Sequence, residues 1–150
     1  DGHDPRQAPV ILVDTNVFMY AVGEDHPHKV PALRFFDAAA DGKHEIAINT
    51  EVLQEILYRF WAIKKMDKGF ELFDYAEKLS DWILPVSREE TRKARDLMKE
   101  TRDLSPRDAL HAATMMKNRI STIVSYDRHF DRIKSIKRIE PTDGVSNGGR

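Results

Sequence analysis

The stretch VILVDTNVFMYA, residues 10–21, decides the fold. An apolar, β-branched run ends at Asp14, gives way to Thr15 and Asn16, and is followed by a second apolar run. The first run is typical of a buried strand, and the second predicts a short helix that begins at Thr15. Asp14 therefore has two interpretations from this stretch alone: the N-cap of that helix, or one member of a catalytic site.

Strands and helices alternate along the rest of the chain. Short apolar runs predict further strands, and amphipathic stretches between them predict helices; the strands fall at 45–49, 83–87, 121–127 and 137–141, and the helices at 28–43, 50–65, 68–82, 88–100 and 105–119. This alternation predicts an α/β fold, a three-layer α/β/α sandwich with a central, mostly parallel sheet. In such sheets, ligands bind beyond the carboxyl ends of the strands.

Length and composition limit the class of protein. The chain has 150 residues, 41% of them hydrophobic and 33% charged, which suits one globular domain. It has no Cys, so disulfides, thiolate metal sites and a cysteine nucleophile are excluded. The net charge of −1 means that any contact with nucleic acid needs a local basic patch. With no signal peptide or membrane span recognisable in this sequence, we expect a cytoplasmic protein.

The domain boundaries follow from composition. We expect an N-terminal tail over residues 1–8, one domain over 9–141, and a flexible C-terminal tail over 142–150, which is rich in Gly, Ser and Asn.

Four acids fall where the predicted elements would bring them to one edge of the sheet. Asp14 and Asp127 each end a strand, Asp108 is the third residue of the helix that follows Ser105, and Glu55 lies beside the apolar stripe of its helix. Each acid also has an ordinary structural explanation, as a helix cap or a solvated surface residue. Together, however, they form a set of hard oxygen ligands that suits Mg²⁺ or Mn²⁺.

Other chemistries lack their motifs. The sequence contains no HExxH zinc motif, no GxSxG elbow, and neither of the glycine-rich phosphate loops GxGxxG and GxxxxGK[ST]. A phosphatase or receiver with Asp14 as phospho-acceptor would need a further acid near it, but Asn16 and an apolar run stand there. His111 reads as a helix-face residue that packs near Asp108.

Four motifs carry a family resemblance. The segments LVDTNVFMYA, TEVLQEIL, SPRDALHAAT and TIVSYDRHFD occur in the order and rough spacing of a PIN-domain nuclease, and the set most resembles the VapC-type toxins of toxin–antitoxin pairs. The resemblance covers about residues 9–141 and implies a PIN-like parallel sheet in an α/β/α sandwich.

The resemblance also implies a mechanism and partners. It assigns the catalytic and metal-binding roles to Asp14, Glu55 (rather than Glu51), Asp108 and Asp127. It implies a Mg²⁺- or Mn²⁺-dependent endoribonuclease that cleaves RNA by metal-activated water, acts as a toxin, pairs with a cognate antitoxin and forms a homodimer.

Residues next to the acids gain roles from this assignment. Asn16 and Ser125, which the resemblance matches to small polar positions, would orient the metal ligands together with Thr15. Arg128 and Arg107 lie close to the acids in sequence and are candidate phosphate contacts.

Two points stay open at this stage. A PIN-like fold kept only for binding a partner is the alternative to an enzyme. The segment from Phe70 to Trp82 reads as a helix with an aromatic face, formed by Phe70, Phe73, Tyr75 and Trp82, for which we favour core or dimer packing over RNA stacking.

Overall fold

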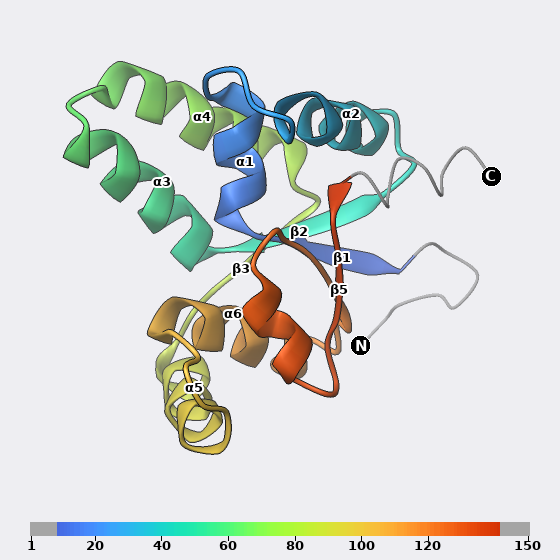
Figure 1. Ribbon diagram of the computed structural model, residues 1–150, viewed down its shortest axis with the longest axis vertical. Coiled ribbons are helices and arrows are strands. Elements are labelled where there is room, and N and C mark those ends of the chain that lie inside the picture. The colour runs from blue at the N-terminus through green and yellow to red at the C-terminus, as the bar shows by residue number, and fades with distance from the viewer. Residues whose placement is uncertain (1–8, 142–150) are drawn as a thin grey trace.

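A computed structural model describes residues 9–141, so the predicted tails, 1–8 and 142–150, lie outside the described residues. Figure 1 shows the course of the chain. The elements in chain order are β1 (Val10–Val13), α1 (Thr15–Val22), α2 (Lys29–Ala40), β2 (Glu45–Asn49), α3 (Thr50–Ala62), α4 (Met66–Leu79), β3 (Trp82–Leu84), α5 (Arg88–Glu100), α6 (Pro106–Lys117), β4 (Thr122–Val124), the short 3₁₀ helix η1 (Arg128–Arg132) and β5 (Lys137–Ile139).

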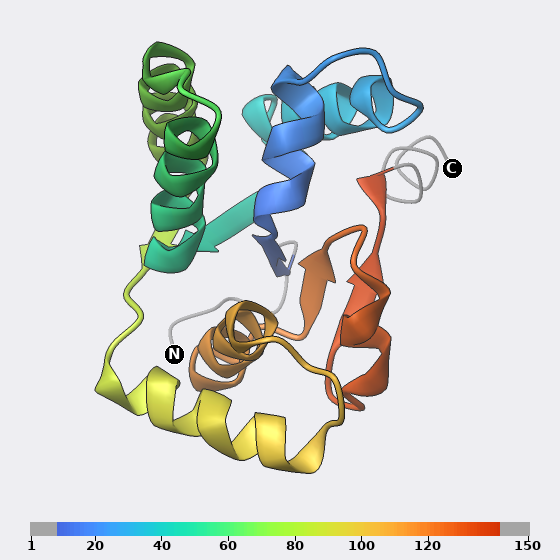
Figure 2. The same cartoon turned by 60° about the vertical axis from the view of Figure 1, so that its left-hand side comes forward.

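The five strands form one parallel sheet in the order β3-β2-β1-β4-β5. Helices α1 to α4 cover one face of this sheet, and α5 and α6 cover the other (Figure 2). The predicted three-layer α/β/α sandwich is therefore confirmed. Because all five strands are parallel, their carboxyl ends lie at one edge, and β1 occupies the centre of that edge.

Alternate residues along the strands point into two separate cores. Val13 and Ile46 pack with α1 to α4, whereas Leu12, Ala47 and Ile123 pack with α5 and α6. This period of two explains why the strands read as continuous apolar runs, since both faces of the sheet are buried.

The region after α4 differs from the sequence prediction. The helix ends at Leu79, and Trp82 belongs to strand β3, where its Nε1 donates a hydrogen bond to Glu45 over 2.6 Å. The prediction that Trp82 shares the aromatic face of the helix is thus wrong, because pairing of β3 with β2 takes this residue into the sheet. Pro85 follows β3 directly, and β3 is an edge strand, as a proline at that position favours.

The amphipathic pattern of α3 is also shorter than predicted. The sequence predicts a helix over 50–65, but the helix ends at Ala62: Val52, Ile56 and Phe60 are buried, whereas Ile63 is its C-cap and is 56% exposed. Within residues 9–141, no helix combines the length and the hydropathy that crossing a membrane requires.

Candidate active site

Asp14 closes the central strand and is held by donors on both of its carboxylate oxygens. Its Oδ1 accepts a hydrogen bond from the backbone N of Thr15 over 2.7 Å, and its Oδ2 accepts one from the hydroxyl of Ser125 over 2.6 Å. The side chain is only 4% exposed. Asp14 thus caps α1, as the sequence suggested, and it also lies at the middle of the ligand-binding edge of the sheet.

The small polar residues named from sequence surround this carboxylate. Nδ2 of Asn16 lies 3.4 Å from Oδ2 of Asp14 and 3.3 Å from Oγ of Ser125. The same Ser125 hydroxyl oxygen accepts a hydrogen bond from the backbone N of Asp127 over 2.9 Å. The Thr15 hydroxyl is buried and has no hydrogen-bond partner among the described residues, so Thr15 contributes through its backbone.

Glu55 reaches the site from the second turn of α3. Its side chain is buried, and its carboxylate forms ion pairs with Nε of Arg107 over 3.2 Å and with Nη1 of Arg59 over 3.7 Å. Oε1 of Glu55, the oxygen that lies 3.2 Å from Arg107, makes no hydrogen bond with any described residue, so a ligand would reach this buried oxygen by displacing the Arg107 ion pair. Glu51, one turn earlier, is only partly buried and belongs to neither of the two groups of convergent ligand atoms described below.

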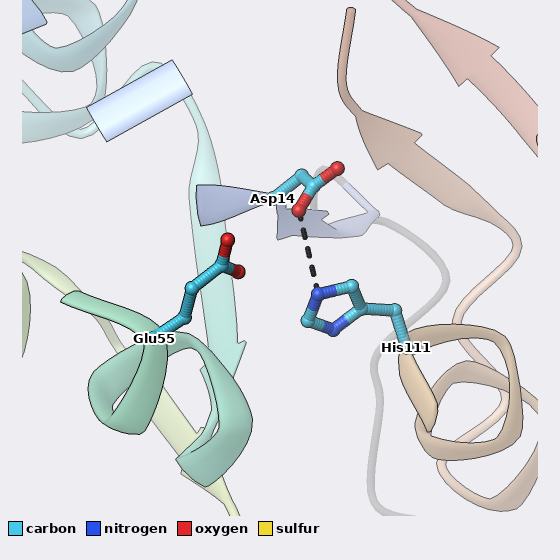
Figure 3. A group of neighbouring side chains, drawn as sticks. All are labelled: Asp14, Glu55 and His111. Atoms are coloured by element: carbon cyan, nitrogen blue, oxygen red, sulfur yellow. Dashed lines mark ion pairs between the residues drawn. The ribbon is translucent and has the colours of Figure 1, made fainter. Parts of the chain in front are cut away.

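His111 completes a first group with Asp14 and Glu55. One ligand atom from each of these three residues lies within 4.8 Å of the others (Figure 3). His111 is fully buried on α6, and its Nε2 lies 3.3 Å from Oδ1 of Asp14. Burial would raise the pKa of Asp14, but the adjacent His111 side chain and hydrogen bonds from Ser125 and Thr15 hold that pKa below its usual value.

A second group lies beside the first and contains Asp108, Asp127 and His129. The backbone N of Asp108 donates to Oγ of Ser105 over 3.1 Å, so the predicted helix start is confirmed. Asp127 caps η1 by accepting from the backbone N of His129 over 2.9 Å, and Nδ1 of His129 lies 3.1 Å from Oδ1 of Asp127. Asp127, like Asp14, therefore caps a helix and also belongs to the group of acids at this edge.

Crowding of the acids changes their proton affinity. Burial, a hydrogen bond with Asp127, and the negative charges of Asp14 and Asp127 raise the pKa of Asp108 to about 8. The pKa of Asp127 is lowered: burial opposes this shift, but the hydrogen bond with Asp108 and the backbone N–H of His129 outweigh it. In the absence of a cation, Asp108 therefore holds a proton that it shares with Asp127 at neutral pH.

These observations fit a divalent cation. Four acidic side chains reach one edge of the sheet, burial and negative neighbours together make Asp108 keep a proton, and a buried oxygen of Glu55 makes no hydrogen bond. A cation would offset the repulsion and take that oxygen as a ligand. Carboxylate oxygens are the donors that Mg²⁺ and Mn²⁺ prefer.

The two predicted phosphate contacts lie in different settings. Arg107 contacts Glu55 directly and is half exposed, so it borders the site. Arg128 is exposed and forms no ion pair within residues 9–141.

Three residues at or beside the site were not predicted from sequence: His111, His129 and Asn49. The sequence placed His111 near Asp108 as a packing residue, and the structure places it against Asp14. Asn49 could have been predicted from sequence, because it stands at the end of strand β2 as Asp14 stands at the end of β1. The carboxyl ends of parallel strands lie at the same edge of the sheet.

Comparisons with known proteins agree with this architecture. The PIN domain family model matches residues 11–136. Ribonuclease VapC13 of Mycobacterium tuberculosis is 42% identical over 130 residues, which cover 87% of this chain and 99% of that protein. Two solved structures share the fold. The sarcin–ricin loop cleaving toxin VapC20 of M. tuberculosis aligns with a TM-score of 0.66 and 18% identity, covering 81% of this chain and 92% of that one. A toxin–antitoxin complex from Klebsiella pneumoniae aligns with a TM-score of 0.59 and 18% identity, covering 87% of this chain and 97% of that one. Because the PIN domain family model matches most of the chain and VapC13 is 42% identical to it, the chain belongs to the PIN domain family.

Proposed function

We propose that this protein is a divalent-metal-dependent endoribonuclease and the toxin of a toxin–antitoxin pair. The observation that carries the proposal is the convergence of Asp14, Glu55, Asp108 and Asp127 at the carboxyl edge of the sheet, with the pKa of Asp108 raised to about 8 by burial and by its acidic neighbours. The relative at 42% identity is named a ribonuclease, which supports the same activity here.

The four carboxylates would hold Mg²⁺ or Mn²⁺. When bound, the cation would supply positive charge at the scissile phosphate and lower the pKa of a water molecule for in-line attack. The chain's own part is to fix the ligands: Ser125, Asn16 and the backbone of Thr15 hold Asp14, and Ser125 also holds the backbone at Asp127. Such supporting hydrogen bonds orient metal ligands and keep them ionised.

Arginine side chains at the rim would bind the RNA backbone. Arg107 and Arg59 both contact Glu55 and are each about half exposed, so their guanidinium groups can turn to a phosphate when a cation takes Glu55. Arg128, exposed next to Asp127, is a third candidate from its position alone.

Exposed apolar side chains of α3, α4 and their connection are candidate contacts for protein partners. Tyr58, Trp61, Ile63 and Phe70 are each more than half exposed. Large exposed apolar patches mark sites of protein association. The toxin–antitoxin complex among the structural neighbours supports an antitoxin partner, and a homodimer is the second association that we propose.

Asp14→Asn tests the assignment. We expect this variant to keep its fold and to lose cleavage of single-stranded RNA with Mg²⁺ or Mn²⁺, because the amide removes a charged ligand at nearly the same size. Unchanged cleavage in a preparation free of other nucleases would show that the site is wrongly assigned.

A matched pair of variants on one helix sharpens the test. Glu55→Gln should abolish cleavage, whereas Glu51→Gln, one turn away, should retain it. The alternative, a PIN-like module without catalysis, would be favoured by a Mn²⁺ titration that gives neither heat nor a change in melting temperature.

A further inference from the structure

Asn49 links the end of strand β2 to His111. It is fully buried, and all the polar atoms of its amide contact neighbours. Its Oδ1 accepts a hydrogen bond from the backbone N of Val52, and its Nδ2 lies 3.0 Å from both Nδ1 of His111 and Oγ1 of Thr114. These contacts join the start of α3 to α6 at the His111 ring nitrogen that does not face Asp14.

The neighbours of Asn49 fix which way its amide faces. The backbone N of Val52 is a donor only, so the amide oxygen must face it. The Thr114 hydroxyl donates to the carbonyl of Leu110 over 2.8 Å, so its oxygen accepts from Asn49. Turning the amide over would place an NH₂ group against the Val52 N–H and remove the N-cap of α3.

The amide orientation determines where His111 carries its hydrogen. Because the Asn49 NH₂ group donates to Nδ1, that nitrogen must present its lone pair, and the hydrogen of the neutral ring then lies on Nε2. A contact on the opposite side of the ring agrees. Nε2 makes no hydrogen bond with any described residue, but it lies 3.3 Å from a carboxylate oxygen of Asp14, where a second lone pair would be repelled and an N–H is attracted.

We infer that Asn49 sets the tautomer of His111, so that His111 turns an Nε2–H towards Asp14 and positions this carboxylate by charge attraction rather than binding the cation itself. Although one ligand atom each of Asp14, Glu55 and His111 converges, a nitrogen that carries a hydrogen has no lone pair for a metal. His111 and Asn49 are then positioning residues, and the cation meets oxygen ligands only. This last consequence rests on the proposed metal-dependent function, whereas the tautomer does not.

The tautomer can be measured without metal. Two-bond ¹H–¹⁵N correlation spectra of the uniformly labelled full chain distinguish the two neutral tautomers by the ¹⁵N shifts of their ring nitrogens. His111 is assigned by the signals missing from His111→Gln, or by proximity to the Phe130 ring if that variant does not fold. We expect the Nε2–H pattern. A protonated Nδ1 in the wild type, whether Nε2 is bare or also protonated, would overturn the inference.

Asn49→Asp tests the role of Asn49 while preserving the helix cap. Aspartate keeps an oxygen for the Val52 N–H but places a carboxylate oxygen, not an NH₂ group, against Nδ1 of His111. We expect Nδ1 of His111 to become protonated in this variant. If its ring signals stay as in the wild type, Asn49 does not set the tautomer. Should the variant not fold, the wild-type spectrum still decides where the hydrogen lies.

Adding Mg²⁺ to the labelled wild type separates this inference from the proposed function. If signals of the acidic cluster shift and the Nε2–H of His111 persists, His111 is not a ligand, as we infer. If Nε2 loses its hydrogen as Mg²⁺ binds, His111 is a ligand and the inference fails. If Mg²⁺ and then Mn²⁺ change nothing in the spectrum, the metal-dependent function fails, while the tautomer stands or falls on the metal-free spectrum.

Discussion

The hydroxyl of Ser125 donates a hydrogen bond of 2.6 Å to Oδ2 of Asp14, although 111 positions separate the two residues in sequence. The contact exists because β1 and β4 are neighbours in the parallel sheet and end at the same edge. The same hydroxyl oxygen accepts from the backbone N of Asp127 over 2.9 Å, so one small side chain positions two of the four acids.

Ser125→Ala should reduce cleavage by about 10–100-fold, the usual effect of losing a group that orients a metal ligand. Because this hydroxyl also accepts hydrogen bonds from the backbone N of Asp127 and from Asn16, we expect the free energy of unfolding to fall by about 1–3 kcal/mol. Cleavage rates at saturating metal, together with thermal melts, measure both effects. Ser121→Ala, an exposed serine that precedes the same strand, is the control and should change neither. Wild-type cleavage by Ser125→Ala would show that this hydrogen bond does not matter.

The acidic cluster should make the metal-free protein less stable as pH rises. Burial and its acidic neighbours raise the pKa of Asp108 from 3.8 to about 8. The folded chain therefore binds a proton more tightly than the unfolded chain, and the stability that this proton contributes is full below about pH 4 and is lost as pH rises towards 8.

Asp108→Asn removes this titration and keeps the side-chain shape. At pH 8 without metal, we expect the variant to exceed the wild type in stability by about 1–2 kcal/mol, while at pH 4 the two should be similar. Urea unfolding at both pH values, with chelator present, measures the difference. The variant should also lose cleavage. Equal stabilities at pH 8 would contradict the raised pKa of Asp108.

Arg107→Gln should weaken RNA binding uniformly across sequences. If Arg107 contacts a phosphate, its loss should lower the slope of log affinity against log salt concentration by about 0.7–1. Fluorescence anisotropy with a labelled single-stranded RNA, titrated at several salt concentrations, measures the slope. Arg95→Gln on α5, where the arginine pairs with Asp96, is the control. A slope identical to wild type would remove Arg107 from the RNA interface.

Gly69→Ala should destabilise the protein even though alanine favours helices. A Cβ at Gly69 of α4 would lie 2.7 Å from Cβ of Phe60 on α3, so the two helices would have to separate. We expect a loss of about 1–3 kcal/mol from overpacking, larger than the gain of about 1 kcal/mol in helix propensity. Chemical denaturation measures it. Lys68→Ala, at the exposed neighbouring position, should change stability by less than about 0.5 kcal/mol. A more stable Gly69→Ala variant would show that α3 and α4 are free to move apart.

Much of the fold follows from local sequence. The apolar run ending at Asp14 predicts a buried strand, and the alternation of strands and helices predicts a parallel sheet covered on both faces; the structure has both. The start of α6 at Ser105 and Pro106 was also readable, because capping depends on adjacent residues. Trp82 was misplaced because pairing with β2, a tertiary contact, decides that this residue joins a strand.

The candidate acids could be named from sequence because each stands at the end of a predicted strand, in the first turn of a predicted helix, or beside the apolar stripe of one. The contacts between side chains could not be predicted from sequence, because they join distant parts of the chain. Asn49 contacts His111, which is 62 positions away, and Arg107 contacts Glu55 on another helix. The sequence by itself determined the elements and the acidic residue types, through periodicity, capping and composition. Only the tertiary structure decided that His111 faces Asp14 and that Asn49 directs its hydrogen, because strand order and the packing of α3 against α6 bring those atoms together.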